Sequence, residues 1–288
     1  MRIFSGIQPT GTKHLGNFIG AIRQYVEGQA RGDPAIYCIV DLHAITVPYE
    51  PAQLRERVLD TTALLLAAGL DPERCVLFYP VLMAADVLAY RADEVPVGED
   101  QREHLELMRD AARRFNARFG EGLLVVPEHR IPTVGARIMD LQEPTRKMST
   151  SGGSVEGTVY VLDDRETVGR KLKRAVTDSE DPFTIRRDPV AKPGVTNLLD
   201  ITAAARGVDP EAVVAELAGA RGYGDLKLAA AEAIVALLAP VRERYAALRA
   251  DEAYLEAVLD QGAVKARALA APVVAEVRAA MGFGPRGR

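Results

Sequence analysis

The chain of 288 residues contains no tryptophan and only two cysteines, Cys38 and Cys75, each inside an apolar run typical of a strand. Two isolated cysteines exclude a disulfide framework and a cysteine zinc site, so we interpret them as small buried side chains in a reducing compartment. No apolar stretch approaches the roughly 20 residues of a membrane-spanning helix, and the N-terminus lacks the apolar core of a signal peptide. We therefore expect a cytoplasmic protein.

Neither sign of charge dominates: 36 lysines and arginines stand against 40 aspartates and glutamates, a formal net charge of −4. This balance argues against a protein that coats nucleic acid without selection, although a local basic face stays open. A hydrophobic content of 48% is enough for one large domain or two moderate ones, each with its own core.

Strand-like and helix-like segments alternate through the first half of the chain. Strands are expected near residues 3–5, 35–41, 75–78 and 95–97, and helices near 17–29, 52–68, 83–90 and 100–119. Such alternation predicts an open parallel sheet with helical crossovers. Ligands of such sheets lie outside the carboxyl ends of the strands.

The second half has a different pattern. One strand-like run, residues 158–162, precedes helices expected near 166–176, 210–220, 225–248 and 251–281. The predicted fold class is therefore α/β, with a parallel-sheet domain at residues 1–150 followed by an all-helical domain at 151–288. We expect the last helix to pack back on the first domain.

One carboxylate, Asp86, stands on the apolar face of an expected helix. At helical spacing Met83, Asp86, Val87 and Tyr90 share that face. A buried unpaired carboxylate costs several kcal/mol, so Asp86 needs a hydrogen-bond donor. The helical pattern alone favours a neighbouring side chain over a ligand as that donor.

The first expected strand leads into a loop with three glycines, Gly6, Gly11 and Gly16, which let the backbone approach a ligand closely. We expect the next helix to begin about Asn17, so that its free N–H groups and the side chains of His14 and Asn17 form an anion site. The glycine spacing matches neither a Walker loop nor the dinucleotide fingerprint. An ordinary strand–turn–helix junction would tolerate the same glycines.

Three further polar segments each have a plain and a functional interpretation. Residues 146–153 place Lys147 in a Ser/Gly-rich loop, which is either a flexible linker or a mobile cation suited to phosphate. Residues 98–101 either cap a helix or contribute polar groups to a site. The basic run at residues 165–174 has the composition of a solvated helix face, with nucleic acid as the alternative partner.

These segments resemble class I aminoacyl-tRNA synthetases. His14-Leu15-Gly16-Asn17 resembles their HIGH motif, and Lys147-Met148-Ser149-Thr150-Ser151 resembles their KMSKS motif. The stretches around them are closer still to bacterial tryptophanyl-tRNA synthetase and follow in one order almost from end to end: residues 4–9, 40–45, 82–86, 95–101, 135–139 and 192–199.

The resemblance implies a Rossmann-like catalytic domain and a two-step reaction of protein biosynthesis. Tryptophan and ATP would form tryptophanyl-adenylate and pyrophosphate, and the acyl group would then pass to the 3′ end of tRNA(Trp). Such chemistry depends mainly on positioning and charge neutralisation. Mg²⁺ would arrive with ATP, without a dedicated protein metal site. The helical domain would bind the anticodon end of the tRNA.

The resemblance also assigns nucleotide-binding residues. Gln8, Gly16 and Asn17 would hold ATP, with His14 near its phosphates. Lys147 and Ser149 would close over the pyrophosphate, and Met148 would pack near the adenine. Among these, the resemblance makes His14, Asn17, Lys147 and Ser149 the catalytic set. Asp100 and Gln101 would lie at the amino-acid and ribose end.

For the amino acid, the resemblance makes Asp86 the acceptor of the indole N–H. The ring would lie in a pocket formed by Phe4, His43, Met83, Val95 and Val97, and the ammonium group would bind Tyr79 and Gln101. The chemistry is consistent, because indole is a flat apolar body with one donor. A site that would leave a buried polar group unpaired rejects analogues without that donor.

The chain departs from the family pattern at two places. Thr150 stands where the second lysine of KMSKS is usual, so one cation is missing. Family members also carry about forty more residues between Phe78 and Tyr79, and their absence would expose apolar surface. The family's homodimer is expected, but helices of its interface and an ATP-binding lysine would belong to that segment.

Two alternatives remain beside a tryptophan–tRNA ligase. The tyrosine-specific relative shares fold and chemistry, although residues 83–86 and 95–101 favour tryptophan. A shortened paralogue could bind tryptophan or ATP without charging tRNA, although retention of both nucleotide motifs argues against it.

Overall fold

The computed structural model describes residues 1–40, 51–78, 83–96, 102–130, 138–149 and 154–282. Contacts between Cα atoms divide the chain into two compact units that interleave in sequence. Unit 1 comprises residues 1–10, 24–131 and 245–288, and unit 2 comprises residues 11–23 and 132–244. The functional boundary expected near residue 150 stays a prediction, and the units are described separately below.

Unit 1 is built on a parallel sheet. In the described residues it has five strands in the order β3-β2-β1-β4-β5: β1 Ile3–Ile7, β2 Ala35–Ile39, β3 Val76–Phe78, β4 Glu94–Pro96 and β5 Glu128–Arg130. All five residues of β2 are buried, as expected of a strand covered on both faces. This confirms the predicted α/β class.

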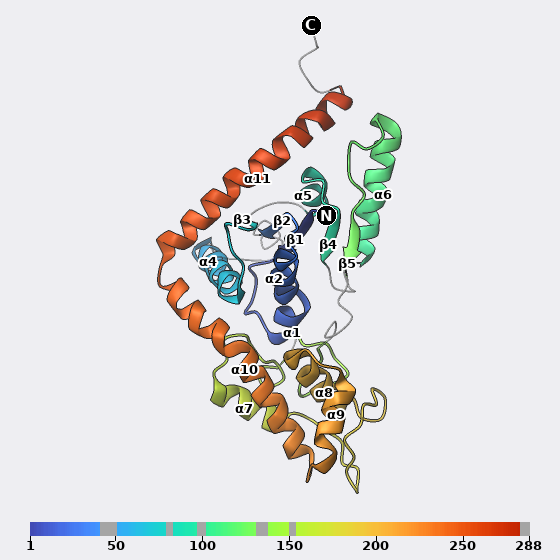
Figure 1. Ribbon diagram of the computed structural model, residues 1–288, viewed down its shortest axis with the longest axis vertical. Coiled ribbons are helices and arrows are strands. Elements are labelled where there is room, and N and C mark those ends of the chain that lie inside the picture. Colours follow the sequence, from blue (N-terminus) through green and yellow to red (C-terminus); the bar gives the residue numbers. More distant parts are fainter. Residues whose placement is uncertain (41–50, 79–82, 97–101, 131–137, 150–153, 283–288) are drawn as a thin grey trace. The chain divides into compact units, whose positions relative to one another are not determined.

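Helices of unit 1 follow and precede the strands of this sheet in the chain. They are α2 Arg23–Ala30, α4 Pro51–Ala68, α5 Met83–Ala89, α6 Arg102–Phe119 and α11 Glu252–Ala280. The long α11 packs against β3, α4 and α5, while α6 runs beside β5 (Figure 1). On α6, Arg109 donates to the Pro127 carbonyl and pairs with Glu128 at 2.7 Å, which attaches the helix to β5.

The core of unit 1 lies under α5 and α11. Its buried side chains come from β1, β2, β4 and the helices, and include Phe4, Val87, Tyr90, Val95 and Ala266. Phe4 stacks on Tyr90 with ring centroids 5.5 Å apart and planes 13° apart. Burying such side chains stabilises the fold by about 1.5–3 kcal/mol each.

Unit 2 is helical apart from paired extended segments. Its elements are α1 Leu15–Asn17, the π-helical turn η1 Phe18–Ile22, α7 Arg165–Arg174, α8 Pro193–Arg206, α9 Pro210–Glu216, the 3₁₀ turn η3 Leu217–Gly219 and α10 Tyr223–Arg249, whose last residues belong to unit 1. Local sequence sets the ends: Asp164 caps α7 through the Thr167 N–H at 2.7 Å, and Gly207 ends α8 with φ of 71°.

The structure differs from the expected elements at three places. The strand-like run at residues 158–162 forms a single bridge, because its backbone pairs over a short stretch with residues 13–15 of unit 2. Helix α8 and strand β5 were not predicted. Pro193 occupies the first helical position of α8, where proline needs no N–H. Among the described residues, no helix combines the length and the apolar character of a membrane span.

Candidate functional site

The HIGH-like segment in unit 2 begins a helix with a histidine cap. His14 is the N-cap of α1, and its Nδ1 accepts the backbone N–H of Asn17 at 3.3 Å, while Asn17 Oδ1 accepts the His14 N–H at 3.2 Å. The helix therefore starts two residues earlier than expected. The Asn17 N–H is occupied by the imidazole, so the predicted anion site of free N–H groups needs correction.

The protonation of His14 follows from its surroundings. Burial, reinforced by the charges of Lys147 and Lys13, lowers the pKa of His14 from 6.5 to about 4. Because Nδ1 accepts a hydrogen bond, the neutral ring carries its proton on Nε2. His14 is thus a neutral hydrogen-bond donor at physiological pH, near a lysine of the second motif.

Gly16 is required by this cap. A Cβ at position 16 would lie 2.9 Å from His14 Cε1 and 3.0 Å from Nδ1. These distances are shorter than van der Waals contact, so a larger residue would displace the ring. The glycine assigned to ATP by resemblance thus has a structural role on the imidazole.

The KMSKS-like segment begins in a tight hairpin of unit 2. Met139 and Lys147 form an antiparallel bridge, with Met148 N–H donating to Ile138 O at 2.9 Å and Asp140 N–H to Arg146 O at 2.8 Å. Lys147 is exposed, whereas Met148 is 1% exposed. The hairpin therefore holds the backbone of Lys147 and leaves its side chain at the surface. Ser149 is half-buried, and Thr150 lies outside the described residues.

A second pairing supports His14 itself. The Leu15 N–H donates to Val159 O at 2.8 Å and the Val161 N–H to Lys13 O at 2.9 Å, on either side of a bridge between His14 and Tyr160. Beneath it, the buried ammonium of Lys171 donates to Thr158 O at 2.8 Å and pairs with Asp163 at 2.7 Å. Residues 138–148 and 158–161 therefore give the two motifs backbone support within one unit.

In unit 1 the structure brings together three of the residues assigned to tryptophan. Phe4 and Val95 lie on the neighbouring strands β1 and β4, and both belong to the core cluster that includes Val87 and Tyr90. Asp86 precedes Val87 on α5 and is only 3% exposed. Burial and, secondarily, the charges of Cys38 and Asp86 raise the pKa of Tyr90, a member of that cluster, so the Asp86 carboxylate adjoins the cluster.

The Asp86 carboxylate is buried and can accept a further hydrogen bond. Its Oδ2 is buried and has no hydrogen-bond partner among the described residues. Burial raises the pKa of Asp86 from 3.8 to about 7. Among the described residues no side chain satisfies this oxygen, and its assignment to the indole N–H stays a prediction.

For the other residues assigned to ATP or tryptophan, the structure shows few contacts or does not describe them. Gln8 in unit 1 is exposed and its Oε1 accepts from Thr10 at 3.3 Å. Met83 starts α5. Outside the described residues lie His43, Tyr79, Val97, Asp100 and Gln101. In the part of the chain that the structure describes, no group of three metal-ligating side chains converges.

Sequence reasoning missed one residue that bears on the hairpin. Asn197 on α8 accepts the Met139 N–H at 3.0 Å and donates to Met139 O at 2.9 Å. The available signal was the motif at residues 192–199, which was noted only as part of the resemblance. Chemically, unit 2 offers a neutral donor and a cation to an anion, while unit 1 offers one acceptor in apolar surroundings.

Comparisons with known proteins agree on one family. The model of the class I tRNA synthetases for tryptophan and tyrosine matches residues 1–79 and 75–239. A Streptomyces avermitilis protein named tryptophan–tRNA ligase 1 is 44% identical over 332 residues, which cover 98% of each chain. The Mycoplasma pneumoniae tryptophanyl-tRNA synthetase structure is 32% identical with a TM-score of 0.86, covering 99% of this chain and 98% of that one.

A third relative is described with ligands. The Campylobacter jejuni tryptophanyl-tRNA synthetase, crystallised with ADP and tryptophan, is 27% identical with a TM-score of 0.77. The match covers 98% of this chain and 100% of that one. By sequence over nearly its full length and by fold, the chain belongs to the class I tRNA synthetases for tryptophan and tyrosine.

Proposed function

We propose that this protein is a tryptophan–tRNA ligase, which forms tryptophanyl-adenylate from tryptophan and ATP and transfers the acyl group to tRNA(Trp). The single observation that carries the choice of amino acid is Asp86, a buried carboxylate whose Oδ2 has no partner among the described residues, beside the apolar cluster of Phe4 and Val95. The relatives named tryptophan–tRNA ligase and tryptophanyl-tRNA synthetase support the same choice.

Indole recognition follows from the chemistry of that cluster. The indole ring is apolar over its whole face and carries one N–H donor, which Asp86 Oδ2 can accept. Phenylalanine would leave the carboxylate unpaired, and the cost of an unpaired buried group is what gives such sites high selectivity. Residues 4, 43, 83, 95 and 97 complete the proposed ring pocket, with Tyr79 and Gln101 on the ammonium group.

ATP is the proposed second substrate, and the Campylobacter jejuni relative with bound ADP supports it. His14, as a neutral donor through Nε2, and Lys147, as an exposed cation, are suited to phosphate oxygens. Gln8, Gly16, Asn17, Met148, Ser149 and Asp100 complete the proposed nucleotide site. Mg²⁺ would enter bound to the nucleotide phosphates.

A segment between Phe78 and Tyr79 is proposed to be missing from this chain. Two findings support this: the family model matches in two stretches that meet at residues 75–79, and the alignment with the Streptomyces avermitilis relative extends over 332 residues against 288 here. The proposed homodimer would then lack part of its interface.

The proposed tRNA partner is assigned to the helical part. Helix α7 carries five basic residues, but Lys171 is buried and Arg170 and Arg174 both pair with Glu156. Arg165 and Lys173 are exposed, and they are the basic side chains of α7 that we propose contact the phosphate backbone of the tRNA. The cytoplasm is the proposed compartment, because tRNA is charged there.

Tryptophan-dependent exchange between ATP and pyrophosphate tests the proposal directly. Because the chain contains no tryptophan, added ligand is the only indole, and its fluorescence reports binding. Asp86→Asn keeps the shape and removes the charge, so tryptophan binding should weaken by about tenfold or more while ATP binding is retained. Asp110→Asn is the matched control, because Asp110 is exposed on α6.

Each outcome has a distinct meaning. Tyrosine-dependent exchange without tryptophan-dependent exchange would assign the chain to the tyrosine-specific relatives. Binding of tryptophan without exchange would indicate a binding module. Equal losses of tryptophan and ATP binding in Asp86→Asn would return Asp86 to a structural role.

A further inference from the structure

The motif at residues 192–199 forms the start of α8, and the proposed reaction gives it no role. Its buried polar residues include Lys192, Thr196 and Asn197, which are 2%, 5% and 4% exposed. Polar groups buried to this degree must be bonded to something specific. In unit 2 each of the three is bonded to a residue outside α8.

Asn197 bonds to the strand opposite Lys147. Its Oδ1 accepts the Met139 N–H at 3.0 Å, and its Nδ2 donates to Met139 O at 2.9 Å. Met139 is the bridge partner of Lys147. One planar amide therefore satisfies both backbone groups of the residue that faces the lysine, and it fixes that residue in position and in orientation.

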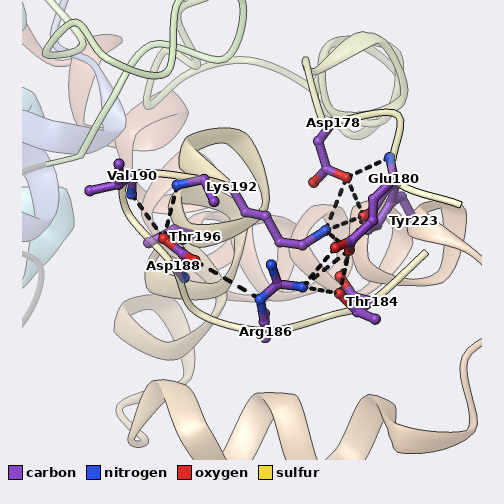
Figure 2. Close-up of polar contacts among 10 residues, drawn as sticks. Asp178, Glu180, Thr184, Arg186, Asp188, Val190, Lys192, Thr196 and Tyr223 are labelled. Carbon is purple, nitrogen blue, oxygen red and sulfur yellow. Dashed lines mark hydrogen bonds and ion pairs between the residues drawn. The ribbon is translucent and has the colours of Figure 1, made fainter. Parts of the chain in front are cut away.

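Lys192 anchors the helix that carries Asn197. Figure 2 shows its ammonium reaching Asp178 at 3.0 Å, the Tyr223 hydroxyl at 2.7 Å and the carboxylate of Glu180. Burial opposes the charge, but these hydrogen bonds raise the pKa of Lys192 above its ordinary value. The ammonium therefore stays charged and holds the first turn of α8 to residues 178–180 and to α10.

Thr196 and Gly194 tighten the same turn. The Thr196 hydroxyl accepts the Asp188 N–H at 2.8 Å (Figure 2). A Cβ on Gly194 would lie 2.1 Å from Val176 O, so only glycine fits there. Val176 in turn donates its N–H to Leu141 O at 2.8 Å. The start of α8 thus contacts the hairpin directly through Asn197 and indirectly through Val176.

We propose that Asn197 is a positioning residue for Lys147 in adenylate formation, acting through Met139. The inference rests on the proposed function, because it needs Lys147 to act on the phosphates of ATP. In such a reaction the cation contributes only if it is held at the developing charge. Asn197 fixes one strand of the hairpin, and the hairpin sets the direction in which Lys147 leaves the backbone.

Asn197→Asp is the most direct test. The substitution keeps the size of the side chain but places a carboxylate oxygen against Met139 O, which removes one hydrogen bond and adds a repulsion. Misplacing a catalytic group by about 1 Å can cost a hundredfold, so we expect kcat/KM for ATP in exchange to fall by about ten- to a hundredfold. The Kd for tryptophan, measured by fluorescence, should change less than about twofold because Asp86 is untouched.

The chain offers a closely matched control. Asn116 on α6 makes the same pair of bonds, accepting the Leu124 N–H at 2.9 Å and donating to Leu124 O at 2.8 Å. Asn116→Asp therefore makes the same chemical change at a backbone clamp in unit 1. We expect it to leave kcat/KM for ATP unchanged. Equal losses in the two variants would overturn the proposal, because breaking either pair of hydrogen bonds would then lower kcat/KM in the same way.

A double-mutant cycle separates positioning from general damage. If Asn197 acts through Lys147, adding Asn197→Asp to Lys147→Ala should lower exchange little further, whereas independent roles give additive losses and overturn the proposal. Should Asn197→Asp unfold, Asn197→Ser, which adds no charge, carries the same expectation. A wild-type enzyme without exchange would instead contradict the proposed function, so the two failures are distinguishable.

Discussion

The backbone N–H of Asn17 donates to His14 Nδ1 at 3.3 Å, and the His14 N–H returns a hydrogen bond to Asn17 Oδ1 at 3.2 Å. This reciprocal pair turns the imidazole so that Nε2 is the ring nitrogen left to donate. The ring packs against the space above Gly16. The absence of a side chain at Gly16 therefore allows the orientation in which His14 Nε2–H can donate.

Gly16→Ala should reduce tryptophan-dependent exchange by about tenfold or more, because its Cβ would displace a group aimed at the developing charge. Tryptophan binding should be unaffected. Gly20→Ala is the control, because a Cβ there meets nothing within 4 Å. Alanine favours a helix over glycine, so a loss at position 16 alone cannot come from helix propensity. Matching activities of the two variants would contradict the role given to the ring.

Lys147→Ala should raise the pKa of His14. The positive charge of Lys147 is the second cause, after burial, of a pKa lowered to about 4. Removing it should move the titration upward but leave it below 6.5, since burial remains. Proton NMR of the four histidines, with His14 assigned from His14→Gln, measures this shift. Lys173→Ala is the control, because Lys173 is exposed on α7. An unchanged His14 titration in Lys147→Ala would show that the charge of Lys147 does not act on His14.

The order of elements in unit 1 was predictable because hydrophobic runs and periodicity carry it. Apolar runs such as β2 are buried on both faces, and this burial selects their composition. Strand β5, with the sequence Glu-His-Arg, has no such signal, because its side chains are exposed or half-buried. It joins the sheet through backbone hydrogen bonds to β4, and such bonds do not depend on the hydropathy of the side chains.

The candidate site was predictable in kind but not in arrangement. His14 and Lys147 were found through motifs, yet their common support depends on pairing between segments distant in sequence. Residues 158–162 were predicted as a strand-like run, but their alternation is the same whichever partner they pair with, so the pairing with residues 13–15 could not be predicted. The role of Asn197 required knowing what faces α8, and a lone asparagine carries no such information.

Tryptophan affinity should decrease as the pH falls below about 7. Burial raises the pKa of Asp86 to about 7 without ligand, so the carboxyl becomes neutral as the pH falls below that value. A neutral carboxyl keeps a carbonyl acceptor, but it binds the indole N–H more weakly than the charged carboxylate does, so the Kd should rise by up to about tenfold for each pH unit below the pKa. Fluorescence titrations between pH 5.5 and 8.5 measure this dependence. Asp86→Asn should show a flat profile, and a flat wild-type profile would exclude the carboxylate as the acceptor.

Asp86→Asn should also stabilise the ligand-free protein, increasingly so at high pH. The pKa of Asp86 is raised in the folded state, so its contribution to stability is lost as the pH rises through about 7. We expect the gain in free energy of unfolding to be ~2 kcal/mol larger at pH 8.5 than at pH 5.5. Urea denaturation at the two pH values measures the difference, with exposed Asp110→Asn as the control.

Saturating tryptophan should reverse that ranking, because ligand that binds only the folded protein stabilises the wild type more than the variant that has lost its acceptor. A residue with a purely structural role would not lower the stability of the ligand-free protein and raise that of the tryptophan complex. If Asp86→Asn gained equally at both pH values, the carboxylate would be neutralised by a partner within the protein, and the indole N–H would no longer be needed to satisfy it.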